Sequence, residues 1–516
     1  MTPGLPAQAR SLLTEAAHAY RGRPAEARLG QAVRQLSGPL RVALAGRVKA
    51  GKSTLLNALV GARVAATDAG ECTKVVTWYR HGPQPAATAF PRTGQPIPLK
   101  VTGTAGQWLL DLAGLPAGDL DRVEVTLPSA WLGRMVLVDT PGMGSLTESA
   151  GRRTQDLLGE TGSVDAVLYL LRHLHSSDVD FLDTFHEAGS GGSTPVNAVG
   201  VLSRADELGG GDPDALGHAA RVAAGYRADP RIHSLVHTVL PVAGLLAETA
   251  ATLTGEEFAT LAALAAAGEP TTRPLLLSTR RFTSAVRGLD VTPEARQRLL
   301  DLLGVYGVRL GLDLIRAGTS TVDELRTALA DRSGLAELRR LLLTQFAERR
   351  DVLKADGALR LVEAVCREDP IPAAPRLRQA VERLRANAHE LTELRLLTDL
   401  RLGAVPGPPA ALAAMERLLG GGGAAITTRL GVSPDTPPAT ARAALTEQHT
   451  HWRRVAQNPL TDPALARAAQ VLQRTCEGLD VGPPPPPPPR PQPPDAERTV
   501  SLRVPPRPGT PGGQRR

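Results

Sequence analysis

The segment at residues 46–54, GRVKAGKST, has the spacing GxxxxGKS and lies between two different apolar patterns. Residues 40–45 before it are typical of a buried strand, and residues 55–59 after it are typical of the first turns of a helix. A strand, a glycine-rich turn and a helix in this order direct backbone N–H groups and a helix N-terminus toward one anion. The segment therefore predicts a loop that holds the phosphates of a nucleoside triphosphate.

Each residue type in this loop has a chemical reason to be there. Gly46 and Gly51 allow backbone geometry and close approach that a side chain would block. Lys52 is expected to reach the β- and γ-phosphates, as a binding and catalytic residue, and the Ser53 hydroxyl to coordinate Mg²⁺. The other residues expected to surround the phosphates are Arg47, Val48, Ala50 and Thr54. The alternative, a strand-to-helix turn without a ligand, is less favoured because both flanks match the motif.

A second motif, DTPG, follows the buried-strand pattern at residues 135–138. It places the carboxylate of Asp139 at the carboxyl end of a strand, where we expect it to bind Mg²⁺ through water. The N–H group of Gly142 is expected to contact the γ-phosphate. These features predict a Walker B strand that continues into a switch II loop.

A third motif, SRAD, follows the apolar run at residues 196–202 and matches the guanine-specifying pattern [TN]KxD with two substitutions. Ser203 opens the motif. Asp206 would accept hydrogen bonds from guanine N1–H and N2–H₂, which adenine cannot offer, and Arg204 would stack on the base. Residues 241–244 are a weak match to the last base-contacting loop. An ATPase with a degenerate base-specificity loop remains an alternative.

Residues 67–74, TDAGECTK, are polar and precede a strand-like run. A switch I loop needs one threonine to coordinate Mg²⁺ in the triphosphate state. Thr73 is the expected metal ligand and catalytic residue, with Thr67 as the alternative. Cys72 is interpreted as a small spacer, because nothing nearby marks its thiol as reactive.

These motifs and the phrases around them resemble the dynamin-like large GTPases, and most closely the bacterial branch that includes the isoniazid-inducible proteins of mycobacteria. The resemblance is carried by GRVKAGKSTLLNALVG, TDAGECTKVVTWYRHG, VLVDTPGMGS and VLSRADELGGG, within residues 40–245. It implies GTP/GDP and Mg²⁺ as cofactors, GTP hydrolysis, and nucleotide-dependent pairing of two GTPase domains. It also implies peripheral binding to a lipid membrane, and a homo-dimer or a hetero-oligomer with a paralogous dynamin-like protein.

Two residues bear on catalysis. Met143 stands where a small signalling GTPase has a water-orienting glutamine, and a thioether cannot make the needed hydrogen bonds. In the family that the chain resembles, domain pairing positions the water instead. The resemblance makes Lys49 a candidate for stabilising transition-state charge, because the matching position carries an arginine finger in guanylate-binding proteins and a cation-holding serine in dynamin. The alternative that Lys49 is an ordinary solvated lysine stays open.

The composition limits the partners and the compartment. A net charge of +7 and a pI near 9.7 suit anionic lipid or nucleic acid, but only 3% of the residues are aromatic. Stacking platforms for single-stranded nucleic acid are therefore not expected, and no nucleic-acid partner is predicted. Three cysteines without an evident pairing fit a reducing cytoplasm. No apolar run reaches about 18 residues, so any membrane contact is expected to be peripheral. With the membrane association that the resemblance implies, the expected location is the cytoplasm and the inner face of the plasma membrane.

Strand and helix signals alternate up to about residue 290, and strand signals nearly vanish after it. This pattern predicts an α/β P-loop GTPase domain with a mainly parallel sheet and helices on both faces, followed by an elongated α-helical bundle. The expected parts are an N-terminal helical neck segment at residues 1–37, the GTPase domain at 38–290, a helical neck and trunk at 291–480, and a disordered proline-rich tail at 481–516.

A proline- and glycine-rich bend at residues 404–426 is the candidate membrane tip, with Arg401, Arg417 and Arg429 nearby. Its apolar residues are Val405, Leu412, Met415, Leu418, Leu419 and Ile426. An interhelical loop packed on the trunk is the alternative.

The expected function is a dynamin-like GTPase that couples pairing of the GTPase domains, or heads, and helical movement to membrane binding or remodelling. The alternative is a soluble GTP-dependent switch or scaffold whose helical half binds protein.

Overall fold

The computed structural model describes residues 4–66, 75–104, 106–112, 114–141, 164–172, 178–179, 182 and 195–480. The described strands are β1 (Leu40–Gly46), β2 (Arg63–Ala66), β3 (Val76–His81), β4 (Ala86–Pro91), β5 (Ile97–Thr104), β6 (Gln107–Asp111), β7 (Leu120–Leu127), β8 (Met135–Asp139), β9 (Ala166–Leu171), β10 (Ala198–Ser203) and β11 (Val239–Val242).

The described helices comprise many short elements and a few long ones. They are α1 (Leu5–Ala19), α2 (Pro24–Gln35), α3 (Lys52–Val60), η1 (Pro195–Asn197), η2 (Ala205–Gly210), α7 (Ala215–Ala228), α8 (Pro230–His233), α9 (Gly244–Thr252), α10 (Gly255–Ala266), α11 (Glu269–Leu275), α12 (Thr279–Phe282), α13 (Pro293–Arg316), α14 (Val322–Arg332), α15 (Leu335–Leu341), η3 (Leu342–Ala347), α16 (Arg350–Glu368), α17 (Ala374–Asn387), α18 (His389–Arg401), α19 (Pro409–Leu418), α20 (Ile426–Leu430), α21 (Pro438–Gln457) and α22 (Pro463–Gly478).

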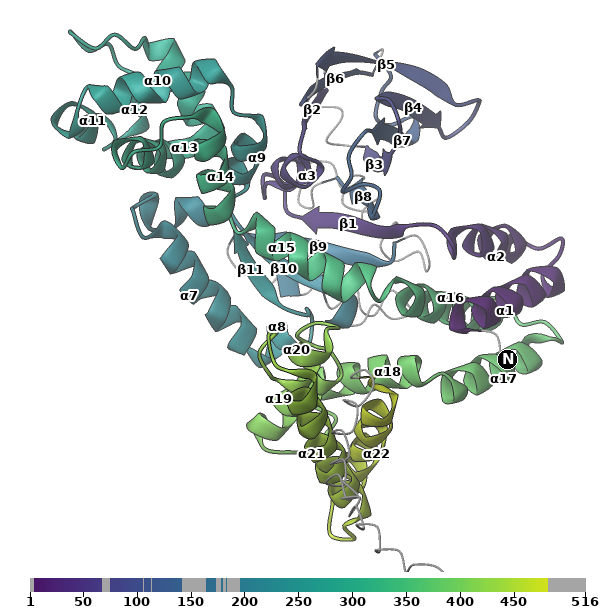
Figure 1. Cartoon of the computed structure of the whole chain (residues 1–516). Helices are drawn as coiled ribbons and strands as arrows, with labels where there is room; N and C mark the ends of the chain where they lie inside the picture. The colour runs from purple at the N-terminus through teal and green to yellow at the C-terminus, as the bar shows by residue number, and fades with distance from the viewer. Residues whose placement is uncertain are drawn as a thin grey trace, which may run out of the picture.

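The described strands form one sheet in the order β11-β10-β9-β1-β8-β3-β7-β4-β5-β6-β2 (Figure 1). The first five run parallel, with Leu44 of β1 opposite Asp139 of β8 and Gly46 opposite Leu170 of β9. Parallel strands place their carboxyl ends at one edge of the sheet. Gly46, Asp139 and Ser203 therefore share that edge, and the predicted P-loop α/β architecture is confirmed.

The other half of the sheet mixes strand directions. β3 is antiparallel to β8 and parallel to β7, whereas β4 and β5 are antiparallel to their neighbours. The patterns used above do not predict the strands at residues 86–127. The alternation of buried and more exposed residues along β7 is the signal that would have found one of them.

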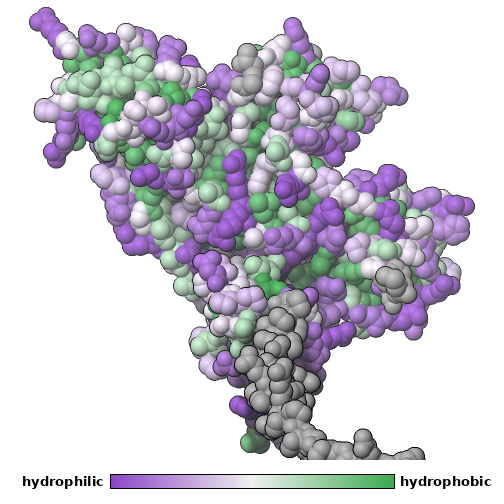
Figure 2. Space-filling view, in the orientation of Figure 1, coloured by the Kyte–Doolittle hydropathy of each residue, from purple (hydrophilic) through white to green (hydrophobic). Residues whose placement is uncertain are grey.

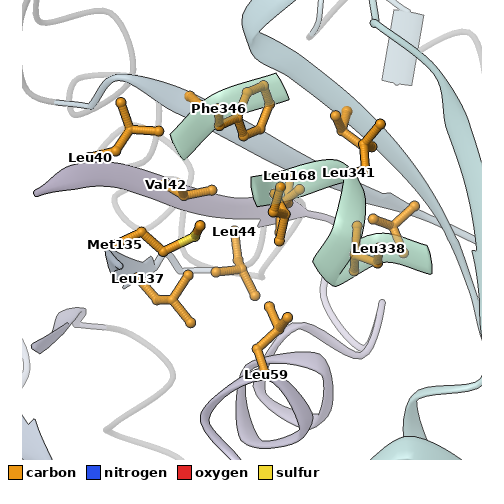
Figure 3. Close-up of a cluster of buried hydrophobic side chains, with 14 of the residues drawn as sticks. Leu40, Val42, Leu44, Leu59, Met135, Leu137, Leu168, Leu338, Leu341 and Phe346 are labelled. Atoms are coloured by element: carbon orange, nitrogen blue, oxygen red, sulfur yellow. The ribbon is translucent and has the colours of Figure 1, made fainter. Parts of the chain in front are cut away.

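Different helices cover the two faces of the parallel half. On β1, Leu40, Val42 and Leu44 belong to one core, together with side chains of α3, α15 and η3 such as Leu59 (Figure 3). Ala43 alternates with them and belongs to a second core that includes side chains of α7 and α8. Helices on both faces agree with the predicted layers.

The helical elements outside these layers form three groups around the sheet (Figure 1). In the first group, α9 to α14 share one hydrophobic core. In the second, α1 and α2 pack with α16 and α17, and the Tyr20 hydroxyl donates to the carbonyl of Asp369 at 2.8 Å. The third group, α18 to α22, shares the core of the sheet face covered by α3 and α15. These groups combine helices of the expected neck and trunk at 291–480 with α1 and α2 and with α9 to α12, which precede residue 290.

A buried charge cluster joins the start of β1 to the second group. The Asp165 carboxylate pairs with Arg41 of β1 at 2.8 Å and with Lys354 of α16 at 3.2 Å. Lys354 also donates to the carbonyl of Gln35, the last residue of α2, at 2.9 Å. Although burial acts in the opposite direction, the Arg41 and Lys354 charges hold the pKa of Asp165 below its usual value. The cluster is therefore ionised and ties the sheet to α2 and α16.

The structure corrects the candidate membrane tip at residues 404–426. Val405, Met415, Leu418 and Leu419 are each at most 6% exposed, because the third group packs its apolar side chains against its own helices and the sheet core. Leu412 and Ile426 are half-buried at the edge of the same core.

Two of the three nearby arginines have protein partners too, whereas Arg417 is exposed. Arg401 is buried, pairs with Glu416 and donates to the carbonyl of His237 at 2.6 Å. Arg429 donates to the carbonyl of Leu418 at 2.7 Å. The packed interhelical segment is therefore the correct interpretation for residues 404–426.

The end of the α21–α22 hairpin is the part of the third group that extends away from the sheet (Figure 1). Leu460, in the turn between the two helices, is 93% exposed. Arg453, Arg454 and Arg467 are exposed near the same end. Among the helices that the structure describes, none has both the length and the hydropathy needed to span a bilayer.

Candidate nucleotide-binding site

The phosphate loop begins where β1 ends, and its glycines are required by geometry. Gly46 has φ +146°, and a Cβ placed on it would lie 2.5 Å from the carbonyl oxygen of Leu170 on β9. Gly51 has φ +93° and caps the N-terminus of α3. Both positions use conformations that glycine adopts readily and other residues do not. The sequence pattern here translates directly into a tight turn followed by a helix N-terminus.

Lys52, the first residue of α3, lies inside this turn and is only 9% exposed. Its Nζ donates to the carbonyls of Gly46 at 3.1 Å and Arg47 at 3.2 Å. Burial lowers the pKa of Lys52, and the nearby Asp139 carboxylate opposes that shift. The ammonium group is thus held where the backbone N–H groups of the loop and the helix dipole also favour an anion.

Asp139 at the end of β8 faces Ser53 at the start of α3. The Ser53 hydroxyl donates to Asp139 Oδ2 at 3.2 Å, whereas the buried Asp139 Oδ1 has no hydrogen-bond partner among the described residues. Burial raises the pKa of Asp139 to about 6, with Lys52 and Ser53 opposing the rise. A hydroxyl and a carboxylate oxygen without a partner are ligands of the kind that Mg²⁺ prefers. The residues present therefore fit a magnesium ion.

The base side of the site is built from the ends of β10 and β11. A pocket with a cavity volume of about 110 Å³ lies between them and the start of α3. Its lining residues are Gly51, Thr54, Leu55, Leu170, Val201, Ser203, Arg204, Asp206, Glu207, Val242, Gly244 and Leu245. Two residues of the weakly matched segment at 241–244 are among them, so the structure brings this segment to the pocket.

Asp206 is the buried carboxylate of this pocket, with 4% exposure. Burial raises its pKa to about 6; among the neighbouring charges, Glu207 raises the pKa further and Arg204 lowers it. A buried carboxylate of this kind is costly without a hydrogen-bond donor, and guanine offers two donors on one edge. The geometry can therefore select guanine over adenine.

A helix from the first group reaches the same carboxylate. α13 is interrupted at Gly304, with φ +63° and ψ 179°, and a Cβ added there would lie 3.7 Å from Asp206 Oδ2. Arg309, five residues further along α13, donates to the carbonyl of Gly211 at the end of the base-side loop at 2.6 Å. Neither contact was predicted, because the two segments are about 100 residues apart and a glycine in a helical pattern carries no specific signal.

The described site residues divide into those that face the pocket and those at the surface. Arg47, Val48 and Lys49 are exposed on the outside of the phosphate loop, and Lys49 has φ +62°. Ala50 is buried beneath it. Thr67, Cys72, Thr73, Gly142 and Met143 lie outside the described residues. Their predicted roles, including those of Thr73 as a metal ligand and Gly142 as a phosphate contact, stay predictions.

Comparisons with known proteins find a GTPase family over this part of the chain. The family described as "50S ribosome-binding GTPase" matches residues 41–191. Over 480 residues the chain is 38% identical to the isoniazid-induced protein IniC of Mycobacterium tuberculosis, covering 91% of this chain and 97% of IniC.

Two further relatives match shorter parts. The isoniazid-induced protein IniA of the same organism is 31% identical over 191 residues, which is 35% of this chain and 28% of IniA. A bacterial dynamin-like protein of Nostoc punctiforme is 30% identical over 146 residues, which is 26% of this chain and 20% of that protein. The similarity to IniC thus extends beyond the nucleotide site into the helical groups.

Proposed function

The chain belongs to the dynamin-like GTPases, in the family of the isoniazid-induced protein IniC, and we propose that it couples Mg²⁺-dependent GTP hydrolysis to membrane binding or remodelling. The observation that carries the proposal is the convergence of three elements on one edge of the sheet. The phosphate loop, the Asp139 carboxylate and the Asp206 carboxylate lie at or just after the carboxyl ends of the parallel strands β1, β8 and β10. Such an edge is where open α/β sheets bind nucleotides.

The phosphate side supplies charge and a metal site. Ser53 and Asp139 would hold Mg²⁺, Asp139 through water, and the ion would neutralise negative charge on the β- and γ-phosphates. Lys52 is expected to turn from the carbonyls of Gly46 and Arg47 toward those phosphates. Thr73 would add a hydroxyl ligand in the triphosphate state.

Hydrolysis in this proposal needs a second GTPase domain, which comes either from another copy of this chain or from a paralogous chain. The described part of the phosphate loop leaves Lys49 exposed, and its positive φ is uncommon for a residue with a side chain. Strain of this kind is often retained at functional sites. Pairing is needed in this proposal because Met143 offers no hydrogen bond that could orient the attacking water. We propose that Lys49 stabilises transition-state charge when two GTPase domains pair.

Pairing makes a kinetic prediction that can be measured on the purified protein. The GTPase rate per molecule should rise with protein concentration until the paired state is saturated. A rate per molecule that is constant from low to high concentration would contradict pairing. The same titration in the presence of a candidate paralogous chain would distinguish a homo-dimer from a hetero-oligomer.

Two contacts support coupling between the nucleotide and the helical groups. The break of α13 at Gly304 lies beside the Asp206 carboxylate, and Arg309 of α13 holds the base-side loop through Gly211. A base that binds Asp206 thus changes the surroundings of a helix in the α9–α14 group. We therefore propose that base binding at Asp206 and the position of α13 are coupled, so that each changes the free energy of the other.

The surface contact with lipid is proposed at the end of the α21–α22 hairpin. Hydrophilic residues predominate on the face seen in Figure 2, and the hydrophobic ones are interspersed among them. Leu460 is 93% exposed, and the exposed Arg453, Arg454 and Arg467 add positive charge near it. An apolar side chain flanked by arginines suits an anionic lipid surface, with about 1 kcal/mol expected per arginine.

Co-sedimentation with liposomes that contain anionic lipid tests this contact. Leu460→Asp should reduce the bound fraction without changing the basal GTPase rate. Leu277→Asp is the matched control, because Leu277 is also an exposed leucine, at 68%, but lies in the α9–α14 group. Equal binding of the wild-type protein and the Leu460→Asp variant would remove the hairpin end as the lipid contact. Absence of lipid binding by the wild-type protein, with and without GTP, would favour the alternative of a soluble switch that binds protein.

A further inference from the structure

Glu207, next to the guanine-reading Asp206, joins two arginines at the edge of the base pocket. Its Oε1 accepts from Arg204 Nη1 at 2.8 Å, and its Oε2 accepts from Arg172 Nη2 at 2.6 Å. The three side chains are 35% to 54% exposed, so they lie at the pocket mouth rather than in the core. Glu207 and Arg204 both line the pocket. No residue in this arrangement except Arg204 has a role in the interpretation given above.

The backbone conformation of Arg204 leaves its side chain many rotamers, so a partner is needed to select one of them. Arg204 follows β10 directly and has φ +54°, a left-handed conformation that is uncommon for arginine. The chain turns sharply there, and the long side chain starts from the turn with many rotamers available. The bond to Glu207, three residues later, selects one of them. Arg172, which follows β9 on the neighbouring strand, fixes the other oxygen of Glu207.

We propose that Glu207 is a positioning residue that holds the guanidinium plane of Arg204 against the base of the bound nucleotide, with Arg172 holding Glu207 in turn. The inference rests on the proposed function, because it needs a guanine nucleotide in the pocket. A guanidinium group can stack on a planar ring, whereas an ammonium group acts as a point charge. A stacked arginine needs a fixed guanidinium plane. Glu207 supplies that constraint, because one of its carboxylate oxygens accepts from Arg204 and the other accepts from Arg172.

Stacking and edge recognition predict different nucleotide preferences. A stacked group contacts the ring face, which guanine and hypoxanthine share, whereas Asp206 reads the N2 amino group that hypoxanthine lacks. Loss of the Glu207 contact should therefore weaken GDP and IDP equally. Loss of the Asp206 contact should change the ratio of the two affinities. This difference separates a positioning role from a general disturbance of the loop around Asp206.

Equilibrium binding of GDP and IDP to the full chain is the test. Glu207→Gln is expected to weaken both nucleotides by the same factor, about fivefold, as for loss of an ordered charged contact. Arg172→Ala should have a smaller effect in the same direction. Glu337→Gln is the matched control, because Glu337 pairs with Arg340 at the same spacing of three residues on α15, and Glu337 is not among the pocket residues. It should bind both nucleotides as the wild-type protein does.

A double-mutant cycle shows whether Glu207 acts through Arg204. In an Arg204→Ala background, Glu207→Gln should have no further effect on either affinity. A full effect in that background, or unchanged affinities in the single variant, would overturn the proposal. Unequal losses for GDP and IDP would overturn it as well. If the folded wild-type protein binds neither nucleotide, the proposed function itself fails, which is a distinguishable result.

Discussion

The phosphate end and the base end of the nucleotide site are built in different ways. The phosphate end comes mainly from consecutive residues around Gly46 and Lys52, and Asp139 joins it from the end of β8. The base end combines the loop after β10, the loop after β11 and the broken helix α13. The phosphate end can therefore be recognised from a local pattern, whereas the base end depends on tertiary contacts and is the part that connects with the helical groups.

The two ends also bury opposite charges. Burial lowers the pKa of Lys52 at the phosphate end and raises the pKa of Asp206 to about 6 at the base end. Each buried charge is costly until a ligand of opposite character arrives. Variants at the two ends should consequently differ in how they change affinity, nucleotide preference and stability.

The largest effect is expected from Lys52→Ala at the phosphate end. Loss of the ammonium group removes a charged contact to the phosphates, so affinity for both GTP and GDP should fall by about 100-fold or more. Guanine and xanthine nucleotides should be affected alike. Isothermal titration with each nucleotide measures this, with Lys100→Ala as the control because Lys100 is an exposed lysine on β5. Retained affinity would mean that the backbone alone binds the phosphates.

Asp206→Asn should have the next largest effect and should change preference. Loss of the carboxylate is expected to cost about 2 to 4 kcal/mol of GTP binding. Xanthosine triphosphate should be accepted instead, because its exchanged donor and acceptor match the amide. Competition between the two nucleotides measures the change. Unchanged GTP affinity would remove Asp206 from the base contact.

The same substitution should stabilise the nucleotide-free protein at neutral pH. A folded-state pKa of about 6, above the ordinary value of 3.8, means that ionisation of Asp206 opposes folding. Protonated Asp206 does not oppose folding, so its contribution to the free energy of unfolding is fully present at low pH and is lost as the pH rises through about 6. Asp206→Asn should therefore raise the free energy of unfolding at pH 8 by up to about 3 kcal/mol, which is seen as a higher unfolding temperature. At pH 4 the substitution should have little effect. An equal change at both values would indicate a packing effect.

A pH titration of binding sharpens the comparison further. Only ionised Asp206 can accept both guanine donors, so GDP affinity should fall below pH 6, by up to about tenfold per pH unit. Asp139 also has a pKa raised to about 6 by burial, and it acts through Mg²⁺. Measurement with GDP in the absence of Mg²⁺ separates the two. The pH dependence should persist there and should be smaller in Asp206→Asn, where the terminal phosphate of GDP, with a second pKa of about 6, still titrates.

The smallest of these effects is expected at Lys49. Lys49→Ala should leave GTP affinity unchanged and slow turnover about tenfold, or 1.4 kcal/mol, if the charge acts in the transition state. Lys49→Arg keeps the charge and should retain most of the activity. A wild-type rate in Lys49→Ala would show that a backbone group or a cation stabilises the charge instead.

The parts of the fold that were predicted are those with a local signal. β1, β8 and β10 are short apolar runs that end in polar motifs, and residues 46–54 have a backbone requirement visible as glycines. The burial of the apolar side chains Val405, Met415, Leu418 and Leu419 had no such signal, because an apolar face looks the same whether protein or lipid covers it. Glu207 was missed for a related reason. Its sequence reads as a solvated charge, and only the fold brings Arg172 to it.

β1 has a phosphate loop at one end and a buried charge cluster at the other. Its seven residues span about 23 Å at roughly 3.3 Å per residue, and both edges are paired with parallel strands. A strand bonded on both sides cannot stretch or bend independently. We therefore expect a shift of Gly46 along the strand axis to reach Arg41, whose partner Asp165 also pairs with Lys354 of α16, and Lys354 donates to the last residue of α2. Hydrogen exchange in α2 is accordingly expected to differ between the GTP- and GDP-bound protein.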